Sequence, residues 1–208
     1  MFNLYSHGGS GNHGCEAIVR STIKVLNENS VNVFSHNVDQ DVKYGIDDIC
    51  NLQKDTLSSI QRGSLKWLLS SIQSKITGRI DLKVKYQRKL LFENIHSGDI
   101  CFSVGGDNYC YAGVEILGAV NHCLRKKHCK TVLWGCSVEP ELLNNQQVIN
   151  DISKFDLITA RESISYQALK RINNNTYLIP DSAFTLDRID LPLPTGWKEI
   201  IPIVVTLG

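Results

Sequence analysis

The chain has 208 residues, a formal net charge of +1 and an ordinary hydrophobic content of 42%. A nearly neutral chain has no overall field that favours nucleic acid or another polyanion, so we expect no nucleic-acid partner. No apolar run approaches the ~18 residues of a membrane span, and no basic region followed by an apolar stretch marks a secretory signal. The seven cysteines are scattered and odd in number, which is typical of reduced thiols in the cytoplasm.

Apolar runs alternate with helical patterns along most of the chain. Strands are predicted at 2–6, 31–36, 99–104, 131–136, 156–160 and 176–180, and helices at 14–28, 109–128, 141–153 and 162–172. Nearly continuous apolar strands that alternate with helices indicate a Rossmann-like α/β domain, in which a parallel sheet has helices on both faces. We assign this domain to 1–190. Ligands of such sheets bind beyond the carboxyl ends of the strands, where every predicted strand except the second delivers a polar or glycine-bearing loop.

The loop after the first strand reads HGGSGNHGCEA at 7–17. Its glycines Gly9, Gly11 and Gly14 satisfy the dinucleotide fingerprint G-x-G-x-x-G, but that fold needs an acidic residue at the end of the second strand. Asp39 lies past that strand. A phosphate-binding P-loop is excluded, because Cys-Glu stands where Lys followed by Ser or Thr is required.

An ordinary tight turn between a strand and a helix explains Gly8, Gly9 and Gly11, since glycine permits positive φ and close packing. It does not explain why Asn12, His13 and Glu16 crowd the start of the helix. We interpret the loop as the acceptor-side wall of a cleft, with glycines for backbone approach and Asn12 and His13 for hydroxyls. His7 and His13 could transfer protons near neutral pH, or serve as loop histidines without a catalytic duty.

The segment 40–97 interrupts this rhythm and is expected to be a basic helical insertion. An apolar helical stripe runs through 65–76, and the stretch 62–89 holds eight basic residues against Asp81 alone, a net charge of +7. One interpretation is the solvated face of two helices that pack on the sheet. The other is a basic amphipathic patch that rests on an anionic membrane surface at the inner face of the cell membrane.

Two further stretches yield weaker expectations. The sequence HCLRKKHC at 122–129 lies near the end of a predicted helix, and its six-residue step turns the two His-Cys pairs apart, so we expect no metal site. The proline-rich stretch at 191–208 is expected to be a linker and the first strand of a truncated second domain.

Five motifs in order carry a resemblance to a known family. They are GGSGNHGCEA at 8–17, GDICFSVGGDNY at 98–109, WGCSVEP at 134–140, ITARESISYQAL at 158–169 and IPDSAF at 179–184. The series resembles the polysaccharide pyruvyl transferase family. The family usually has Asp where Cys15 stands, so a carboxylate at that place is not required here or its role has changed.

The resemblance implies two Rossmann-like domains that face each other across a cleft, as in the GT-B class of glycosyltransferases. It implies transfer of an enolpyruvyl unit from phosphoenolpyruvate, the donor substrate, onto two hydroxyls of a sugar or lipid-linked saccharide of a surface polysaccharide. No cofactor is implied. An Arg-x-His motif that handles phosphoenolpyruvate is expected in the second domain, and these 208 residues do not contain it, so the chain is expected to be incomplete alone.

The candidate catalytic residues are His7, His13, Asp107 and Arg161. Candidate substrate-binding residues follow the strand ends: Gly8, Gly9, Gly11, Asn12, Gly105, Gly106, Asp107, Asn108, Arg161, Glu162 and Asp181. Carboxylate and amide side chains suit sugar hydroxyls, although Asp107 and Asn108 could equally be turn caps. Arg161 suits a carboxylate or phosphate, or forms a salt bridge that caps the next helix beside Glu162.

Two other functions remain open on the sequence. One is a GT-B-like glycosyltransferase that uses a nucleotide sugar. The other is a non-catalytic binding module or fragment. The oligomeric state is left open.

Overall fold

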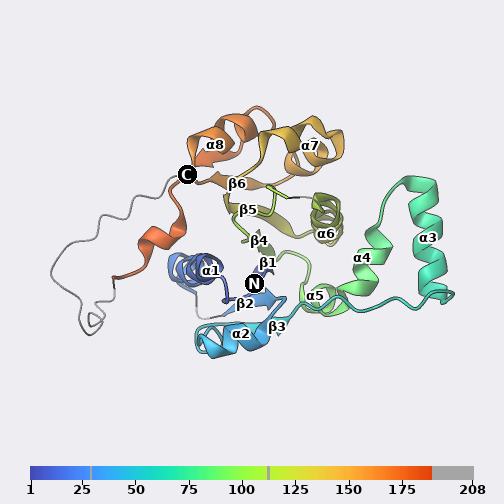
Figure 1. Ribbon diagram of the computed structural model, residues 1–208, viewed down its shortest axis with the longest axis horizontal. Coiled ribbons are helices and arrows are strands. Elements are labelled where there is room, and N and C mark those ends of the chain that lie inside the picture. Colours follow the sequence, from blue (N-terminus) through green and yellow to red (C-terminus); the bar gives the residue numbers. More distant parts are fainter. Residues whose placement is uncertain (29, 112, 189–208) are drawn as a thin grey trace, which may run out of the picture.

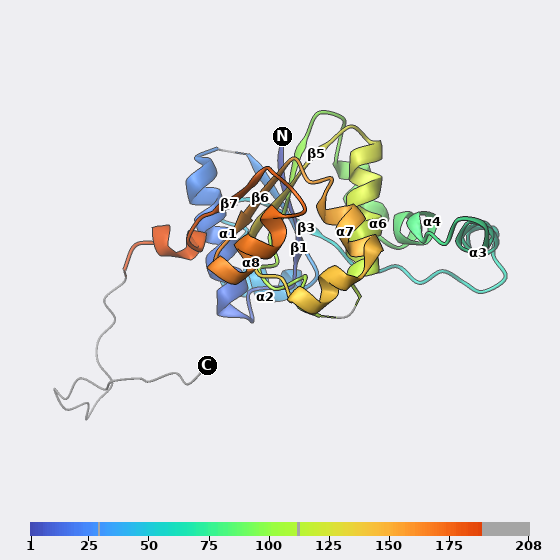
Figure 2. The same ribbon diagram turned by 90° about the horizontal axis from the view of Figure 1, so that it is seen from above.

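The computed structural model describes residues 1–28, 30–111 and 113–188. The described strands form one parallel sheet in the order β3-β2-β1-β4-β5-β6-β7, a doubly wound Rossmann-like arrangement, and the predicted α/β class is confirmed (Figures 1 and 2). The predicted boundary at 190 and the predicted linker and strand at 191–208 lie outside the described residues. The strands are β1 (Phe2–His7), β2 (Val31–Ser35), β3 (Asn51–Lys54), β4 (Ile100–Ser103), β5 (Lys130–Cys136), β6 (Leu157–Ala160) and β7 (Thr176–Leu178).

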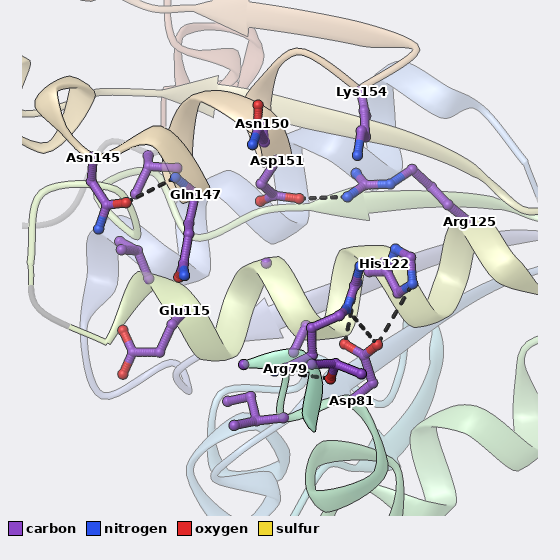
Figure 3. Close-up of a pocket in the computed structure, with 17 residues that line it drawn as sticks. Arg79, Asp81, Glu115, His122, Arg125, Asn145, Gln147, Asn150, Asp151 and Lys154 are labelled. Carbon is purple, nitrogen blue, oxygen red and sulfur yellow. Dashed lines mark hydrogen bonds and ion pairs between the residues drawn. The ribbon is translucent and has the colours of Figure 1, made fainter. Parts of the chain in front are cut away.

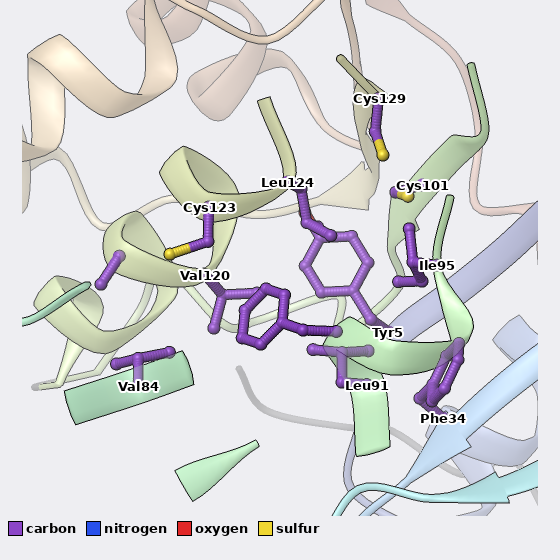
Figure 4. Close-up of a cluster of buried hydrophobic side chains, with 12 residues drawn as sticks. Tyr5, Phe34, Val84, Leu91, Ile95, Cys101, Val120, Cys123, Leu124 and Cys129 are labelled. Atoms are coloured by element: carbon purple, nitrogen blue, oxygen red, sulfur yellow. The ribbon is translucent and has the colours of Figure 1, made fainter. Parts of the chain in front are cut away.

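Helices cover both faces of the sheet. They are α1 (His13–Leu26), α2 (Val38–Lys43), α3 (Leu65–Thr77), α4 (Asp81–Gln87), α5 (Lys89–Asn94), α6 (Val114–Lys126), α7 (Gln146–Ile152) and α8 (Ser163–Lys170), with short 3₁₀ turns η1 (Pro140–Asn144) and η2 (Ser182–Thr185). Alternate strand residues point to opposite faces. Leu4 and Val33 pack with α1 on one face, whereas Tyr5 and Phe34 pack with α4, α5 and α6 on the other (Figure 4).

The prediction and the structure differ at three elements. The strand β3 was missed because it is a half-exposed edge strand whose only apolar residue is Leu52. The helix predicted from residue 109 begins at Val114, because Tyr109 instead forms a parallel bridge to Val138. The helix predicted at 141–153 is divided into η1 and α7, which Asn145 caps through the backbone N–H of Gln147.

A row of asparagines, buried at Asn3 and Asn32 and exposed at Asn51, crosses one end of the sheet. Asn51 donates to Asn32 (2.7 Å), Asn32 donates to Asn3 (2.7 Å), and Asn3 donates to Asp99 (3.0 Å). The three asparagines are paired residues on β1, β2 and β3. A shift of one residue would leave these buried amides without partners, so the row fixes the register of three strands.

The basic insertion forms a helical hairpin, α3–α4, that projects from the body of the domain (Figures 1 and 2). The interpretation of two helices packed on the sheet is wrong for α3, which packs on α4 instead. The basic residues of this segment do not all lie on its surface. Arg88 is 6% exposed and pairs with buried Asp55, so it belongs to the interior and not to the surface patch.

Candidate functional site

The loops expected to form the site follow β1, β4, β5, β6 and β7 at the carboxyl edge of the sheet. The strands β1 and β4 are neighbours, and the connections on either side of them run in opposite directions, so the sheet has its topological switch point here. This is where open parallel sheets bind ligands. The glycine loop after β1 and the Gly-Gly turn after β4 therefore meet at the predicted place.

The glycine loop begins where the end of β1 is distorted. The register of β1 against β2 shifts between Leu4 and His7, and Ser6 has a φ of +65°, a left-handed conformation that is costly for a residue with a side chain. Gly9 follows with a φ of +114°. A Cβ on Gly9 would lie 2.8 Å from Cβ of Asn37, so glycine is required there by both backbone conformation and space.

The carboxylate of Asp41 on α2 anchors this loop through hydrogen bonds. Its Oδ1 accepts hydrogen bonds from the backbone N–H of Ser10 (2.9 Å) and the hydroxyl of Ser10 (2.5 Å), and it lies 2.8 Å from Nε2 of His7. Asp41 is fully buried. Burial alone would raise the pKa of Asp41, but hydrogen bonds from Ser10, Ser35 and His7 outweigh that effect and hold the pKa below its usual value.

The start of α1 provides the polar side chains of the loop. Asn12 is the N-cap, and its Oδ1 accepts from the backbone N–H groups of Gly14 (2.9 Å) and Cys15 (3.4 Å). His13 is exposed, and its Nδ1 lies 3.0 Å from Oε2 of Glu16, while Oε1 of Glu16 accepts from Arg20 (2.8 Å). Burial would raise the pKa of Glu16, but hydrogen bonds from His13 and Arg20 lower it.

The second wall is the Gly-Gly turn after β4. Asn108 N–H donates to the carbonyl of Gly105 (3.1 Å), and its side-chain amide reaches the carbonyl of Ser6 at 3.5 Å. This long contact links the turn to the end of β1. The carboxylate of Asp107 accepts from the hydroxyl of Tyr111 (2.9 Å), which is exposed.

Arg161 at the end of β6 reaches across to this turn. A Cβ on Gly106 would lie 2.7 Å from Nη1 of Arg161, so a larger residue there would move the guanidinium from its present place. The guanidinium donates to Asp181 (3.0 Å) and to the hydroxyl of Ser137 (2.9 Å). Of the alternatives left open for Arg161, an ion pair is formed, but with Asp181, while Glu162 caps α8 through the backbone N–H of Ser165 (2.9 Å).

The thiol of Cys15, on the first turn of α1, lies close to charged groups that follow β4 and β6. Burial raises the pKa of Cys15; the nearby negative charge of Asp107 raises it further, and Arg161 lowers it. Cys110 responds in the same way to burial, to Asp107 and to Arg161. Residues from the ends of β1, β4 and β6 thus lie within reach of one another's charge.

The structure distinguishes His7 from the other candidates. Its ring is 1% exposed and directed at Asp41, so it holds the loop, whereas exposed His13 is available to a ligand. Sequence reasoning missed Asp41, Ser10 and Ser137. Asp41 lies six residues beyond the end of β2, and nothing in the sequence indicates that α2 folds against the glycine loop and brings this carboxylate to it.

A separate cavity of about 330 Å³ lies between α6, α7 and the turn before α4 (Figure 3). Charged side chains line it, but Arg125 pairs with Asp151 (2.6 Å) and Arg79 pairs with Asp81 (2.9 Å). These groups lie along the flank of α6 and not among the strand-end loops. Among the described residues, no group of three or more His, Cys, Asp or Glu side chains has the arrangement of a metal site.

A comparison with family models identifies the ordered motifs. The model described as polysaccharide pyruvyl transferase matches residues 12–202. The chain belongs to this family. The match includes the start of α1 from Asn12, the Gly-Gly turn and Arg161, whereas the glycines at 8, 9 and 11 precede it. Neither a curated protein nor a solved structure matches the chain.

Proposed function

We propose that this chain forms the acceptor-side half of a pyruvyl transferase that builds a pyruvate ketal on a sugar or lipid-linked saccharide. Phosphoenolpyruvate is the donor. Two sugar hydroxyls add to C2 of the enolpyruvyl unit, one proton goes to its methylene carbon to give a methyl group, and phosphate leaves with the other proton. The observation that carries the proposal is the meeting of the glycine loop, the Gly-Gly turn and Arg161 at the switch point of a chain in this family.

The polar groups at this edge suit the two kinds of chemistry that the reaction needs. The carboxylate of Asp107 and the amide of Asn108 can bind sugar hydroxyls, and carboxylates at such positions accept a hydroxyl proton. His13, exposed and held by Glu16, is the candidate for proton transfer at this edge. Arg161 offers a planar cation toward the carboxylate or phosphate of the donor, with Asp181 and Ser137 fixing its orientation.

The proposed compartment is the cytoplasm, where phosphoenolpyruvate would be supplied. All seven cysteines are free thiols in the structure, which supports a reducing environment. Among the described residues, no helix is long and apolar enough to cross a membrane.

Acceptor binding tests the proposal on the 208-residue chain itself. Saturation-transfer NMR with a panel of saccharides should detect binding that Asp107→Asn weakens at least tenfold, since a hydrogen bond to a charged group contributes about 1.5–3 kcal/mol. Asp187→Asn is the matched control, because Asp187 is exposed and pairs with Lys24 (2.8 Å) on the last turn of α1. Equal binding by both variants would contradict the assigned site.

Turnover tests the reaction. In the presence of phosphoenolpyruvate and a bound saccharide, the enzyme with its second domain should release phosphate and yield a new methyl resonance of a pyruvate ketal. Binding of uridine or cytidine diphosphates without phosphate release from phosphoenolpyruvate would instead favour a glycosyltransferase. Saccharide binding with no turnover in any form of the protein would favour a binding module.

A further inference from the structure

The helix α3 presents an apolar stripe to the outside of the molecule. Five side chains form it, each 41–79% exposed: Leu65, Leu68, Leu69, Ile72 and Ile76. At 3.6 residues per turn, these positions fall within an arc of about 100°. A single exposed leucine needs no explanation, but a continuous row of five on one helix marks an interaction surface.

The opposite face of α3 is the one that packs on α4, and it consists of serines around one indole, that of Trp67, which is 37% exposed. Ser70 is 7% exposed, and Ser71 and Ser74 are half-buried toward α4. The carbonyl of the Gln73 side chain accepts from the backbone N–H of Leu82 (2.8 Å), which ties the two helices together. The polarity of α3 is therefore the reverse of that of a helix covering a core, whose apolar stripe faces inward.

Basic side chains border the stripe. After buried Arg88 and the Arg79–Asp81 pair are set aside, the cations of this segment are Arg62, Lys66, Lys75, Lys83, Lys85 and Lys89. Lys66 and Lys75 fall on opposite flanks of the stripe, about 110° and 70° from its centre. The only carboxylate between 62 and 89, that of Asp81, is buried. The exposed surface of the hairpin therefore carries positive charge, apolar side chains and a few neutral polar groups, with no exposed carboxylate.

We propose that α3 docks on an anionic lipid bilayer, lying flat in the interface with its leucine and isoleucine stripe inserted and Lys66 and Lys75 at the headgroups. Apolar residues between two basic flanks are the pattern of an interfacial helix. A second copy of the chain is the poorer occupant, because two such hairpins would bring like charges together. A bilayer of anionic lipids complements both the apolar stripe and the charge.

The position of the hairpin suits a flat partner. In both views α3 is the outermost helix, and α4 lies between it and the rest of the domain (Figures 1 and 2). With 13 residues, α3 is too short to span a bilayer and can only lie on one.

Co-sedimentation of the full chain with vesicles tests the proposal. Vesicles of equimolar phosphatidylglycerol and phosphatidylcholine should bind the chain, vesicles of phosphatidylcholine alone should bind it at least tenfold more weakly, and added salt should weaken binding. Lys66→Glu with Lys75→Glu should lower the affinity at least about 25-fold, since each cation lost near the surface costs about fivefold. Leu68→Ser with Ile72→Ser should lower it about tenfold or more.

The matched control is Lys130→Glu with Lys154→Glu, two exposed lysines of the body that change the net charge equally. It should leave vesicle binding within about threefold. All these positions are exposed, so unchanged urea midpoints should show that each variant folds. Equal binding to both kinds of vesicle, or equal loss in the control, would overturn the proposal. So would a dimer in light scattering that Leu68→Ser with Ile72→Ser dissociates, without vesicle binding by the original chain.

Discussion

Replacing Asp41 by alanine should destabilise the domain by about 3–5 kcal/mol, the usual loss when one partner of a buried charged network is removed. The carboxylate is fully buried and satisfies both donors of Ser10 and the ring of His7. Its loss leaves buried polar groups without an acceptor, each costing about 1–3 kcal/mol. For a domain of this size, the midpoint of thermal unfolding should fall by roughly 10 °C. Urea unfolding followed by circular dichroism measures the change in free energy.

The pH dependence gives a second readout of Asp41. Because its pKa in the folded state lies below the usual 3.8, its contribution is fully present above that value and is lost as the pH falls through the folded-state pKa. The difference in unfolding free energy between the original chain and Asp41→Ala should therefore be constant near neutral pH and shrink below pH 3.8. The control is Asp39→Ala, exposed on the same helix, which should cost about 1 kcal/mol at most. A loss below 1 kcal/mol for Asp41→Ala, or an equal loss for both variants, would refute the reasoning.

Three further predictions follow from other contacts. Gly106→Ala should displace Arg161 and lower the free energy of unfolding by about 1–3 kcal/mol, and it should reduce saccharide binding in the same NMR assay. Unchanged binding would show that the site does not depend on the close approach of Gly106 and the Arg161 guanidinium. Tyr109→Phe should cost about 1–2 kcal/mol in urea unfolding, because it removes a 2.6 Å hydrogen bond to Asp151 while Arg125 still pairs with that carboxylate. Burial raises the pKa of Cys136 to about 12, so mass spectrometry should find this thiol unlabelled by iodoacetamide at pH 8 in the folded chain and labelled in urea; labelling at similar rates in both states would contradict its burial.

The sequence predicted the sheet well because its inner strands are buried on both faces. Val31–Ser35 and Ile100–Ser103 read as short apolar runs between helical patterns, and parallel pairing followed from that alternation. The edge strand β3 escaped because an edge needs apolar residues on one side only, and Asn51–Lys54 has a single one. The strand-end rule then placed the candidate loops at one edge without any knowledge of the strand order.

Side-chain pairing was the part that the sequence could not supply. Arg161 was expected beside Glu162, its neighbour in the chain, yet its partner is Asp181 from the next strand end. Arg88 was counted with the surface cations, although the distant carboxylate of Asp55 draws it into the interior. Periodicity identified the stripe of α3, but which side of that helix meets the protein depends on α4 and cannot be read from α3 alone.

The central place of β1 has a consequence for how the molecule is made. Phe2 pairs with Val31 on one side and with Ile100 on the other, so one neighbour of the first strand is synthesised much later than the other. Until β4 emerges, β1 has an unpaired edge that can associate with other chains. The long basic hairpin lies in the sequence between these two partners, so it increases the delay between the synthesis of β2 and that of β4. The entropic cost of closing the longer loop grows only slowly with its length. The junction of β1 and β4 that carries the candidate site therefore forms only after the whole basic hairpin has been synthesised, and β5, β6 and β7 then extend the sheet from β4.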